Sequence, residues 1–333
     1  MRDLDSLALR VRSGRLQVLD QTRLPFEEAW LDGSDPGEMV GHIQRLSVRG
    51  APLIGVAAAL SLAAFAEAGA SAAALVAACA ELRRARPTAV NLMAATDRLK
   101  AVMEAGGGAA DLVQEAEAVF DEDVALCEAM ARHGVPLLSP GEAVLTHCNS
   151  GGLATAGVGT ALGVIRRAWE AGKVSRVYVD ETRPLLQGAR LTAWELKALG
   201  IPFTLITDSM AAVLMLEGWV SRVLVGSDRI ARNGDFANKV GTYGLAVQAR
   251  HHGVPFHPVA PWTTVDLDCP DGAAIPIEQR APAEVRGFGA LTWAPEGEVF
   301  NPAFDVTPAR LATSLVLDRG VALPGTDLAA WRP

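Results

Sequence analysis

The chain has 333 residues, about twice the size of a typical domain, so we expect two domains or one large α/β domain with an extension. Half of the residues are hydrophobic and 20% are charged, which excludes a mainly disordered protein. The net charge of −8 argues against a nucleic-acid partner, because binding to phosphates requires a cationic surface.

The cysteines and the most apolar segment bear on where the protein works. The four cysteines are widely spaced and form no C-x-x-C pair, which favours reduced thiols: Cys79, Cys127, Cys148 and Cys269. The first residues contain no apolar run of the signal-peptide kind, so we expect a cytoplasmic protein. Residues 53–80 imitate a membrane span, since Glu67 is their single charged residue. They are rich in alanine, glycine and serine and are interrupted at Gly69, so we expect two short, tightly packed helices and no membrane partner.

The first part of the chain shows mainly helical patterns. We expect a hairpin strand at residues 15–20, followed by helices at 53–67, 72–85 and 111–132. Pro52 marks the start of the first helix, and Pro87 ends the second because a residue before proline avoids helical geometry. We place a domain boundary within or just after the third helix. This gives a mostly helical domain with a short β-hairpin at residues 1–125, and a second domain at 126–333.

The second part alternates short β-branched runs with helical segments. The runs are at residues 143–146, 177–179, 203–206, 223–225 and 256–259. This alternation is typical of βα units and predicts an α/β fold with a parallel sheet. Because ligands bind outside the carboxyl ends of such strands, the polar residues that follow the strands are expected to meet at one crevice.

Cys148 is the cysteine placed for chemistry. It follows a strand and precedes Gly151-Gly152, after which we expect a helix through Arg166 whose N-terminus would stabilise a thiolate. The alternative is a buried inert thiol, which is our interpretation of Cys79 and Cys127. His147 would serve as a base or a metal ligand, but no second ligand lies at a metal-binding spacing, so we predict a structural histidine and no metal.

One carboxylate and three cations are further candidates. Asp228 follows an apolar strand, so partial burial would raise its pKa toward the range useful for proton transfer. The alternative for Asp228 is a salt bridge with Arg229 or a helix cap. Arg49, Arg86 and Lys239 stand in loop-like surroundings and together would bind a phosphate, although each alone is more often a surface charge.

A dehydrogenase is a weaker alternative. Gly157-Val158-Gly159 with Gly163 is similar to a dinucleotide-binding fingerprint, and Asp180-Glu181 lies about 20 residues further on. The fingerprint glycines should directly follow the first strand, however, whereas Gly157 is expected inside a helix, where close packing explains it as well.

Several longer motifs in this sequence occur together in one known family. They are Arg49-Gly50-Ala51-Pro52, Arg86-Pro87-Thr88-Ala89-Val90-Asn91-Leu92, Thr146-His147-Cys148-Asn149, Glu181-Thr182-Arg183-Pro184-Leu185-Leu186-Gln187-Gly188-Ala189-Arg190-Leu191-Thr192, Gly226-Ser227-Asp228-Arg229-Ile230, Asn233-Gly234-Asp235 and Asn238-Lys239-Val240-Gly241-Thr242-Tyr243. From about Gly14 to Arg319 the chain resembles the methylthioribose-1-phosphate isomerases of methionine salvage. The related families are the ribose-1,5-bisphosphate isomerases and the regulatory subunits of the translation-initiation exchange factor.

The resemblance implies an aldose–ketose isomerase that converts 5-methylthioribose 1-phosphate to 5-methylthioribulose 1-phosphate with no redox cofactor and no metal. It implies a mostly helical N-terminal domain, a Rossmann-like catalytic domain and a homodimer. Asp228 would donate a proton that helps to open the sugar ring, and Cys148 would be its partner in moving hydrogen between C1 and C2. The substrate contacts that it implies are Arg49, Gly50, Ala51, Arg86, Gln187, Asn238 and Lys239.

Two alternatives stay open beside this interpretation. A ribose-1,5-bisphosphate isomerase would require further cationic contacts for its second phosphate, whereas a methylthio group requires an apolar slot. A regulatory subunit of a translation factor would bind a sugar phosphate or nucleotide without converting it, and the presence of both Cys148 and Asp228 argues against this.

Overall fold

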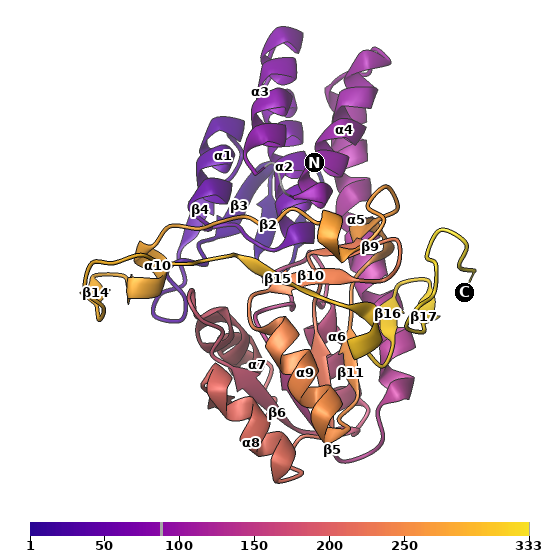
Figure 1. Cartoon of the computed structure of the whole chain (residues 1–333). Helices are drawn as coiled ribbons and strands as arrows, with labels where there is room; N and C mark the ends of the chain where they lie inside the picture. The colour runs from indigo at the N-terminus through magenta and orange to yellow at the C-terminus, as the bar shows by residue number, and fades with distance from the viewer. Residues whose placement is uncertain (87–88, 333) are drawn as a thin grey trace. The chain divides into compact units, whose positions relative to one another are not determined.

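A computed structural model describes residues 1–86 and 89–332 of the chain (Figure 1). Contacts divide them into two compact units. The first unit consists of Met1–Glu128 together with Ser150–Gly159, and the second consists of Ala129–Asn149 together with the chain from Thr160 onward.

The first unit begins with a four-stranded antiparallel sheet. Its strands, in spatial order, are β1 (Leu4–Asp5), β2 (Leu9–Arg12), β3 (Arg15–Leu19) and β4 (Trp30–Asp32). The turn between β2 and β3 uses Ser13 and Gly14 at φ values of 50° and 76°, the left-handed geometry that tight hairpins require. Leu16 and Val18 point into the core while Arg15 is exposed, so the predicted hairpin strand is confirmed.

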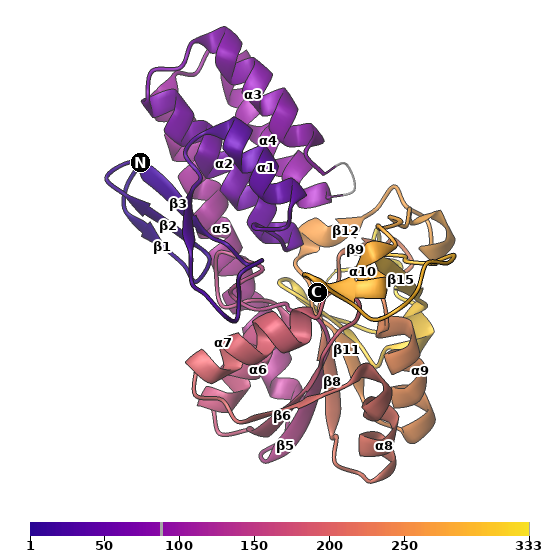
Figure 2. The ribbon, with the colours of Figure 1, turned by 90° about the vertical axis from the view of Figure 1, so that its left-hand side faces the viewer.

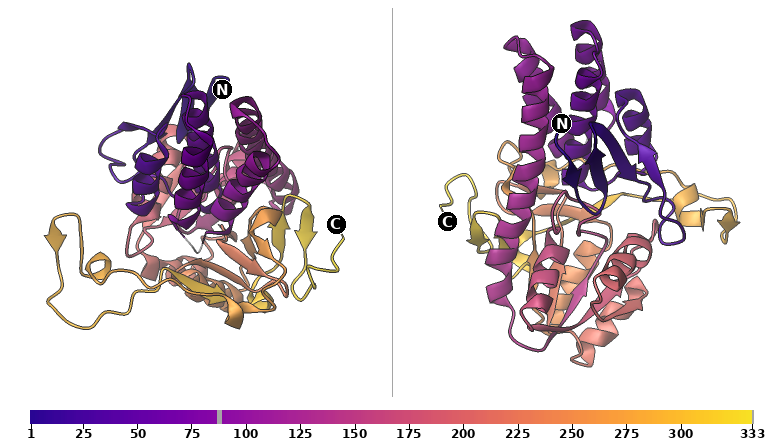
Figure 3. Two further views of the ribbon diagram at one scale, coloured as in Figure 1. Left: turned by 90° about the horizontal axis from the view of Figure 1, so that it is seen from above. Right: turned by 180° about the vertical axis from the view of Figure 1, so that it is seen from behind.

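Helices follow the sheet in the first unit, and they pack against one another (Figure 3). They are α1 (Pro36–Gln44), α2 (Ala51–Glu67), α3 (Ala72–Arg84), α4 (Val90–Glu104) and α5 (Ala109–Gly134), of which α5 continues into the second unit. Helix α2 is buried on nearly all sides, and a Cβ on its Gly55 would lie 2.7 Å from the carbonyl oxygen of Asn91 in α4. Close helix packing therefore explains the apolar run of residues 53–80, as predicted. No described helix combines the length and apolar character needed to cross a bilayer.

The second unit is built on a five-stranded parallel sheet (Figure 2). In spatial order its strands are β11 (Phe256–Pro258), β8 (Arg222–Val225), β5 (Glu142–Thr146), β6 (Val174–Asp180) and β7 (Phe203–Ile206). Each contains most of a run that the sequence predicts as a strand. The α/β class, with a helical N-terminal region followed by a parallel sheet, is thus confirmed.

Helices cover both faces of this sheet. Helices α6 (Ala161–Glu170) and α7 (Ala193–Ala198) lie on one face, and α8 (Ala211–Leu216) and α9 (Thr242–His252) lie on the other (Figure 2). The chain starts at the central strand β5, builds outward to β7, and then returns to β8 on the other side of β5. The direction of strand addition reverses between β5 and β8, and a doubly wound sheet binds its ligands at such a switch point.

A smaller mixed sheet lies next along the chain. Its spatial order is β12 (Val265–Asp266), β9 (Arg229–Ala231), β10 (Phe236–Lys239) and β15 (Phe304–Thr307). Phe236 of β10 stacks on Phe256 of β11 with ring centroids 6.4 Å apart, which joins the two sheets in one core. The remaining elements are α10 (Ala283–Arg286) and two hairpins, β13 (Gly287–Phe288) with β14 (Leu291–Thr292) and β16 (Leu315–Leu317) with β17 (Gly320–Ala322).

Candidate active site

The switch point places the two proposed catalytic side chains after neighbouring strands. Strands β5 and β8 pair in parallel, with Leu145 beside Val223. Cys148 follows the end of β5 by two residues, and Asp228 follows the end of β8 by three. Adjacent strands lie about 4.8 Å apart, so the topology brings both residues to one edge of the sheet.

The backbone of Cys148 has an unusual conformation that two threonines hold. Its φ is +64°, in the left-handed region that non-glycine residues rarely adopt. The N–H of Cys148 donates to Oγ1 of Thr182 at 2.8 Å, and the hydroxyl of Thr192 donates to the carbonyl of Cys148 at 2.6 Å. Cys148 is partly exposed, whereas the other three cysteines are buried.

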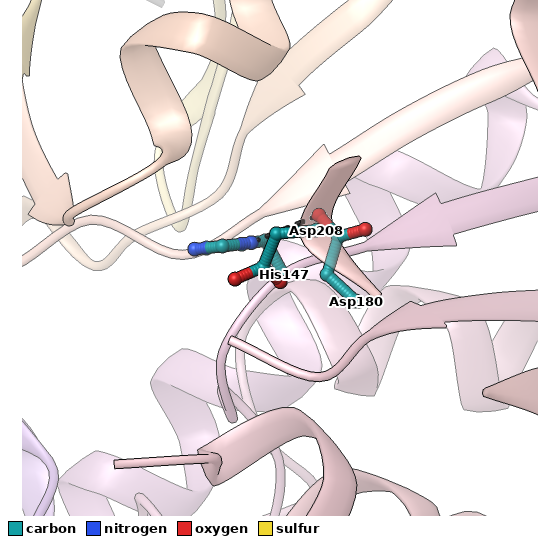
Figure 4. A group of neighbouring side chains, drawn as sticks. All are labelled: His147, Asp180 and Asp208. Atoms are coloured by element: carbon teal, nitrogen blue, oxygen red, sulfur yellow. Dashed lines mark hydrogen bonds and ion pairs between the residues drawn. The ribbon is translucent and has the colours of Figure 1, made fainter. Parts of the chain in front are cut away.

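His147 lies at the centre of a polar cluster with Asp180 and Asp208, in which His147 and Asp180 are buried and Asp208 is partly exposed (Figure 4). Its Nδ1 lies 2.9 Å from Oδ2 of Asp180, and its Nε2 donates to the carbonyl of Val240 at 3.0 Å. Both carboxylate oxygens of Asp208 accept backbone N–H groups, those of Thr182 and Arg183, each at 2.7 Å. The cluster therefore connects the ends of β5, β6 and β7 and the segment that follows β10.

Both pKa shifts in this cluster indicate a retained proton. Burial alone would lower the pKa of His147, but the hydrogen bond with Asp180 and the nearby negative charges raise it above the ordinary value. Burial raises the pKa of Asp180, and His147 opposes that shift in part. Each of the two groups therefore keeps its proton to a higher pH than it would in isolation. When the His147 ring carries both protons, Nδ1 donates to Asp180 and Nε2 donates to the carbonyl of Val240.

The same three side chains could also hold a metal ion, because their ligand atoms lie within 4.8 Å of one another. In the described part of the chain they are the group that meets this criterion. A hydrogen bond already accounts for the 2.9 Å contact between the His147 ring and Asp180. Oδ1 of Asp180 has no hydrogen-bond partner among the described residues. The arrangement is that of a buried histidine–carboxylate pair beside Cys148.

Arg229, the residue after Asp228, forms an ion pair with a carboxylate from another strand. Asp228 is partly buried, and its N–H donates to the carbonyl of Ala237 in β10 at 2.9 Å. The guanidinium of Arg229 binds the carboxylate of Asp266, with Nε 3.0 Å from Oδ2. The alternative in which Arg229 serves as the partner of Asp228 thus competes with a well-formed Arg229–Asp266 pair.

Three proposed substrate contacts lie in the second unit. Asn238 and Lys239 end β10 and are buried; Nδ2 of Asn238 donates to Oγ1 of Thr242 at 2.9 Å, and Nζ of Lys239 donates to the carbonyl of Ala303 at 2.8 Å. Gln187 is 6% exposed, and its Oε1 has no hydrogen-bond partner among the described residues. Gln187 immediately precedes a π-helical turn, Gly188–Thr192, a feature frequent at functional sites.

The other proposed contacts lie in the first unit. Nε of Arg49 donates to Oε1 of Gln21 at 2.9 Å. Gly50 caps the N-terminus of α2 at a φ of +98°, and a Cβ there would lie 2.6 Å from Cα of Ala154, so both the backbone conformation and the close contact require glycine. Ala51 is the first residue of α2, and Arg86 follows α3; Pro87 and Thr88 of its motif lie outside the described residues.

The segment after Cys148 corrects two predictions. Residues 151–160 form an irregular loop and α6 begins only at Ala161, so no helix N-terminus follows Gly151-Gly152, and Gly157 is not inside a helix. Small residues with many glycines made the loop look helical. The N–H of Ala156 donates to Oδ2 of Asp123 at 2.6 Å, and that of Gly157 also binds Asp123. A carboxylate of the chain itself thus occupies the donors that a dinucleotide phosphate would use.

The sequence reasoning missed the partners that hold the site. The sequence placed Asp180 at the end of a predicted strand and Thr182 within one of the family motifs. No sequence pattern linked Asp180 to His147. Thr192 and Glu195, which both accept from Nδ2 of Asn149 at 3.2 Å, lie more than 40 positions away in the sequence.

Comparisons with known proteins agree along nearly the whole chain. The profile of the initiation factor 2 subunit family matches residues 47–324. A methylthioribose-1-phosphate isomerase from Cronobacter sakazakii is 59% identical over 329 residues, which cover 97% of each chain. The crystal structure of 5-methylthioribose 1-phosphate isomerase from Pyrococcus horikoshii OT3 is similar with a TM-score of 0.90 and 41% identity, covering 97% of this chain and 93% of that one. The translation initiation factor eIF-2B subunit delta from A. fulgidus is similar with a TM-score of 0.84 and 39% identity, covering 96% of each.

Proposed function

We infer that this chain, which belongs to the initiation factor 2 subunit family and within it to the methylthioribose-1-phosphate isomerases, converts 5-methylthioribose 1-phosphate to 5-methylthioribulose 1-phosphate in methionine salvage. The observation that carries this proposal is the presence of a thiol and a carboxylate after the two strands that flank the switch point.

The reaction requires a proton donor and a hydrogen-transfer partner. Phosphate on the anomeric oxygen prevents the sugar from opening to a free aldehyde. We propose that Asp228 gives a proton to the ring oxygen as the bond from C1 to that oxygen breaks. A hydrogen and an electron pair then move from C2 to C1, either as a hydride or as a proton by way of an enol, and the C2 hydroxyl gives its proton to the Asp228 carboxylate as it becomes the ketone. Cys148 takes part in this transfer, and a general acid or base of this kind contributes about 10²–10⁴-fold to the rate.

The remaining proposed residues bind the substrate. Arg49, Arg86 and Lys239 supply positive charge for the phosphate, and the N-terminus of α2 at Gly50 and Ala51 has no side-chain cap, which leaves it suited to an anion. Gln187 and Asn238 bring neutral polar groups suited to sugar hydroxyls. The unpartnered Oε1 of Gln187 supports this role, since a buried polar atom without a partner is costly unless a ligand satisfies it.

An assay on the purified protein tests the proposal. Incubation with 5-methylthioribose 1-phosphate and no added cofactor should yield the ketose phosphate. Cys148→Ala and Asp228→Asn should each lower kcat by about 10²–10⁴-fold while the fold stays intact by circular dichroism. Cys269→Ala and Asp268→Asn are matched controls and should keep normal rates. Near-normal turnover of either site variant would remove that residue from the mechanism.

The substrate itself needs a comparison. Ribose 1,5-bisphosphate is the alternative sugar, and the ratio of kcat/KM for the two substrates decides between them. A ratio that favours the bisphosphate would overturn the methylthio preference.

The second candidate function is binding of a sugar phosphate without conversion, because the chain is similar to an eIF-2B subunit. Both Cys148 and Asp228 are present, however, and a protein that only binds has no need of this pair. Isothermal titration that shows tight binding of the sugar phosphate, with no product after long incubation, would favour the second candidate.

We further propose that the protein is a cytoplasmic homodimer. None of the four cysteines forms a disulfide, as expected in a reducing compartment. Large apolar side chains are exposed on α8 and α9 and after α8, which is typical of a surface that a second subunit covers: Val213, Leu216, Trp219, Tyr243 and Val247. Cell fractionation tests the location, and the dimer is tested as described in the Discussion.

A further inference from the structure

Backbone strain in this protein is concentrated beside the proposed catalytic thiol. Among the described residues, five non-glycine residues have positive φ, and three of them belong to the loops after β5 and β6: Cys148, Thr182 and Leu186. Each such residue is costly to the folded state and persists only where its surroundings enforce it. The surroundings of Cys148 therefore must supply specific restraints.

Two threonine hydroxyls supply restraints on both sides of Cys148. Thr182, from the loop after β6, accepts the N–H of Cys148 at 2.8 Å. Thr192, from the π-helical turn, donates to the carbonyl of Cys148 at 2.6 Å. Hydrogen bonds of these lengths are directional, so together they fix both peptide groups that flank the Cys148 Cα. We call Thr182 and Thr192 the threonine clamp.

The clamp residues are themselves held in place. Both are at most 1% exposed. The Thr182 hydroxyl donates to the carbonyl of Asp180 at 3.1 Å, and the Thr192 hydroxyl accepts from Nδ2 of Asn149 at 3.2 Å. A Cβ on Gly188 would lie 1.7 Å from the carbonyl oxygen of Asp180, so the turn that carries Thr192 can approach the end of β6 because this residue is glycine.

We propose that Thr182 and Thr192 are positioning residues that hold Cys148 in its left-handed conformation and thereby fix the direction of its thiol toward the substrate. This inference rests on the proposed role of Cys148 in the reaction. Neither threonine is expected to touch the reacting atoms; each acts through the peptide groups of Cys148.

Paired substitutions at the two positions test the clamp. Thr192→Val and Thr182→Val keep the shape and β-branching of the side chain but remove the hydroxyl, whereas Thr192→Ser and Thr182→Ser keep the hydroxyl. We expect the valine variants to lose about 10²-fold in kcat with little change in KM, since a misplacement of about 1 Å has an effect of this size. The serine variants should recover most of the rate.

Thr96→Val is the matched control. Thr96 is buried in α4, and its hydroxyl donates to carbonyls within its own helix, those of Leu92 at 2.8 Å and Met93 at 3.0 Å. This variant loses a buried hydroxyl of the same kind and should lose thermal stability while its kcat stays normal. If Thr182→Val does not fold, the Thr192 pair provides the same comparison.

A second readout does not depend on turnover. Alkylation of Cys148 by iodoacetamide, followed by peptide mass spectrometry across pH, reports the environment of the thiol. Wild type and the serine variants should share one pH profile. In the valine variants the profile should move toward that of a short unstructured peptide that contains the same cysteine.

The outcomes separate this inference from the proposed function. Normal kcat and an unchanged alkylation profile in Thr192→Val, together with an inactive Cys148→Ala, would overturn the clamp alone. Full activity of Cys148→Ala would overturn the role of Cys148 and, with it, the clamp. Serine variants as slow as the valine variants would also contradict the inference, because the hydroxyl would then not be the group that matters.

Discussion

Individual side chains at the strand ends of the second unit are held by contacts that leave little freedom. His147 binds Asp180 on one side and the carbonyl of Val240 on the other. Gly241 follows Val240 at a φ of +107°, and a Cβ there would lie 2.9 Å from Cε1 of His147. Glycine at this position allows the segment after β10, which begins at Val240, to close onto the histidine.

The histidine–carboxylate pair makes a prediction about protonation. In Asp180→Asn the carboxylate that raises the pKa of His147 is gone, so burial should leave the ring neutral at pH 7. Nitrogen-15 NMR of histidine-labelled protein, followed across pH, should show that the His147 ring keeps its second proton to higher pH in wild type than in the variant. His147→Gln identifies the signal. Equal titration midpoints in the two proteins would contradict the prediction.

The same pair has a defined effect on stability. A histidine whose folded pKa is raised stabilises the fold fully below its unfolded pKa of about 6.5, and this contribution is lost as pH rises through the folded value. As pH rises above about 6.5, unfolding in urea should therefore show wild type losing stability relative to Asp180→Asn. A constant difference across this range would contradict the linkage.

At the residue scale, the sequence predicted which side chains occupy strand ends but not their partners. Cys148 and Asp228 were placed correctly after β5 and β8 because a strand followed by a polar residue is a local pattern. Thr182 and Thr192 reach Cys148 from 34 and 44 positions away, and such contacts depend on strand order and on a π-helical turn that no local pattern specifies. The roles of the proposed site residues stay predictions until the variants are assayed.

At the scale of elements, prediction succeeded where a repeated pattern was long or bounded. The five parallel strands were recognised from β-branched runs, and α2, α3 and α5 from their extent and their terminating residues. Helix α4 was not assigned, and the loop of residues 151–160 was taken for helix. That loop owes its shape to a tertiary contact with α5, which composition alone does not reveal. The division at residues 125 and 126 stays a prediction.

The contact between α5 and the loop is pH-dependent. Burial raises the pKa of Asp123 to about 6, although the N–H groups of Ala156 and Gly157 favour its charged form. The folded state therefore holds this proton more tightly than the unfolded chain, whose value is near 3.8. Stability should fall as pH rises from about 4 to 6, by about 3 kcal/mol for two pKa units.

Asp123→Asn tests this element. The variant lacks the titrating group, so its unfolding free energy should not show this titration. The unfolding free energy of wild type should therefore fall relative to that of the variant as pH rises across this range. Urea denaturation at closely spaced pH values measures the difference. Asp121→Asn, at an exposed position on the same helix, should follow wild type throughout. Parallel curves for wild type and Asp123→Asn would exclude the proposed titration.

At the scale of the whole molecule, the exposed apolar side chains on and next to α8 and α9 form a surface for which a second subunit would account. Leu216 and Trp219 are 68% and 56% exposed. Leu216→Glu, alone and with Trp219→Glu, should shift the protein from dimer to monomer in light scattering coupled to size exclusion, because charge on a buried interface is costly. Val76→Glu, which changes an exposed apolar residue of α3, is the control and should remain a dimer. A wild-type monomer at micromolar concentration would overturn the homodimer proposal.

The ten residues from Ser150 to Gly159 have a consequence for how this protein can be divided. They pack with the first unit, although they follow Cys148 by only two positions and are encoded in the middle of the second. Asp123, Gly50 and Gln21 all contact this insert through Ala156, Ala154 and Leu153. No single cut in the gene therefore releases the first unit with its packing complete. We expect a fragment of residues 1–128 to unfold without cooperativity unless a peptide of residues 150–159 is supplied, so exchange of segments between relatives must carry the insert along with the N-terminal half.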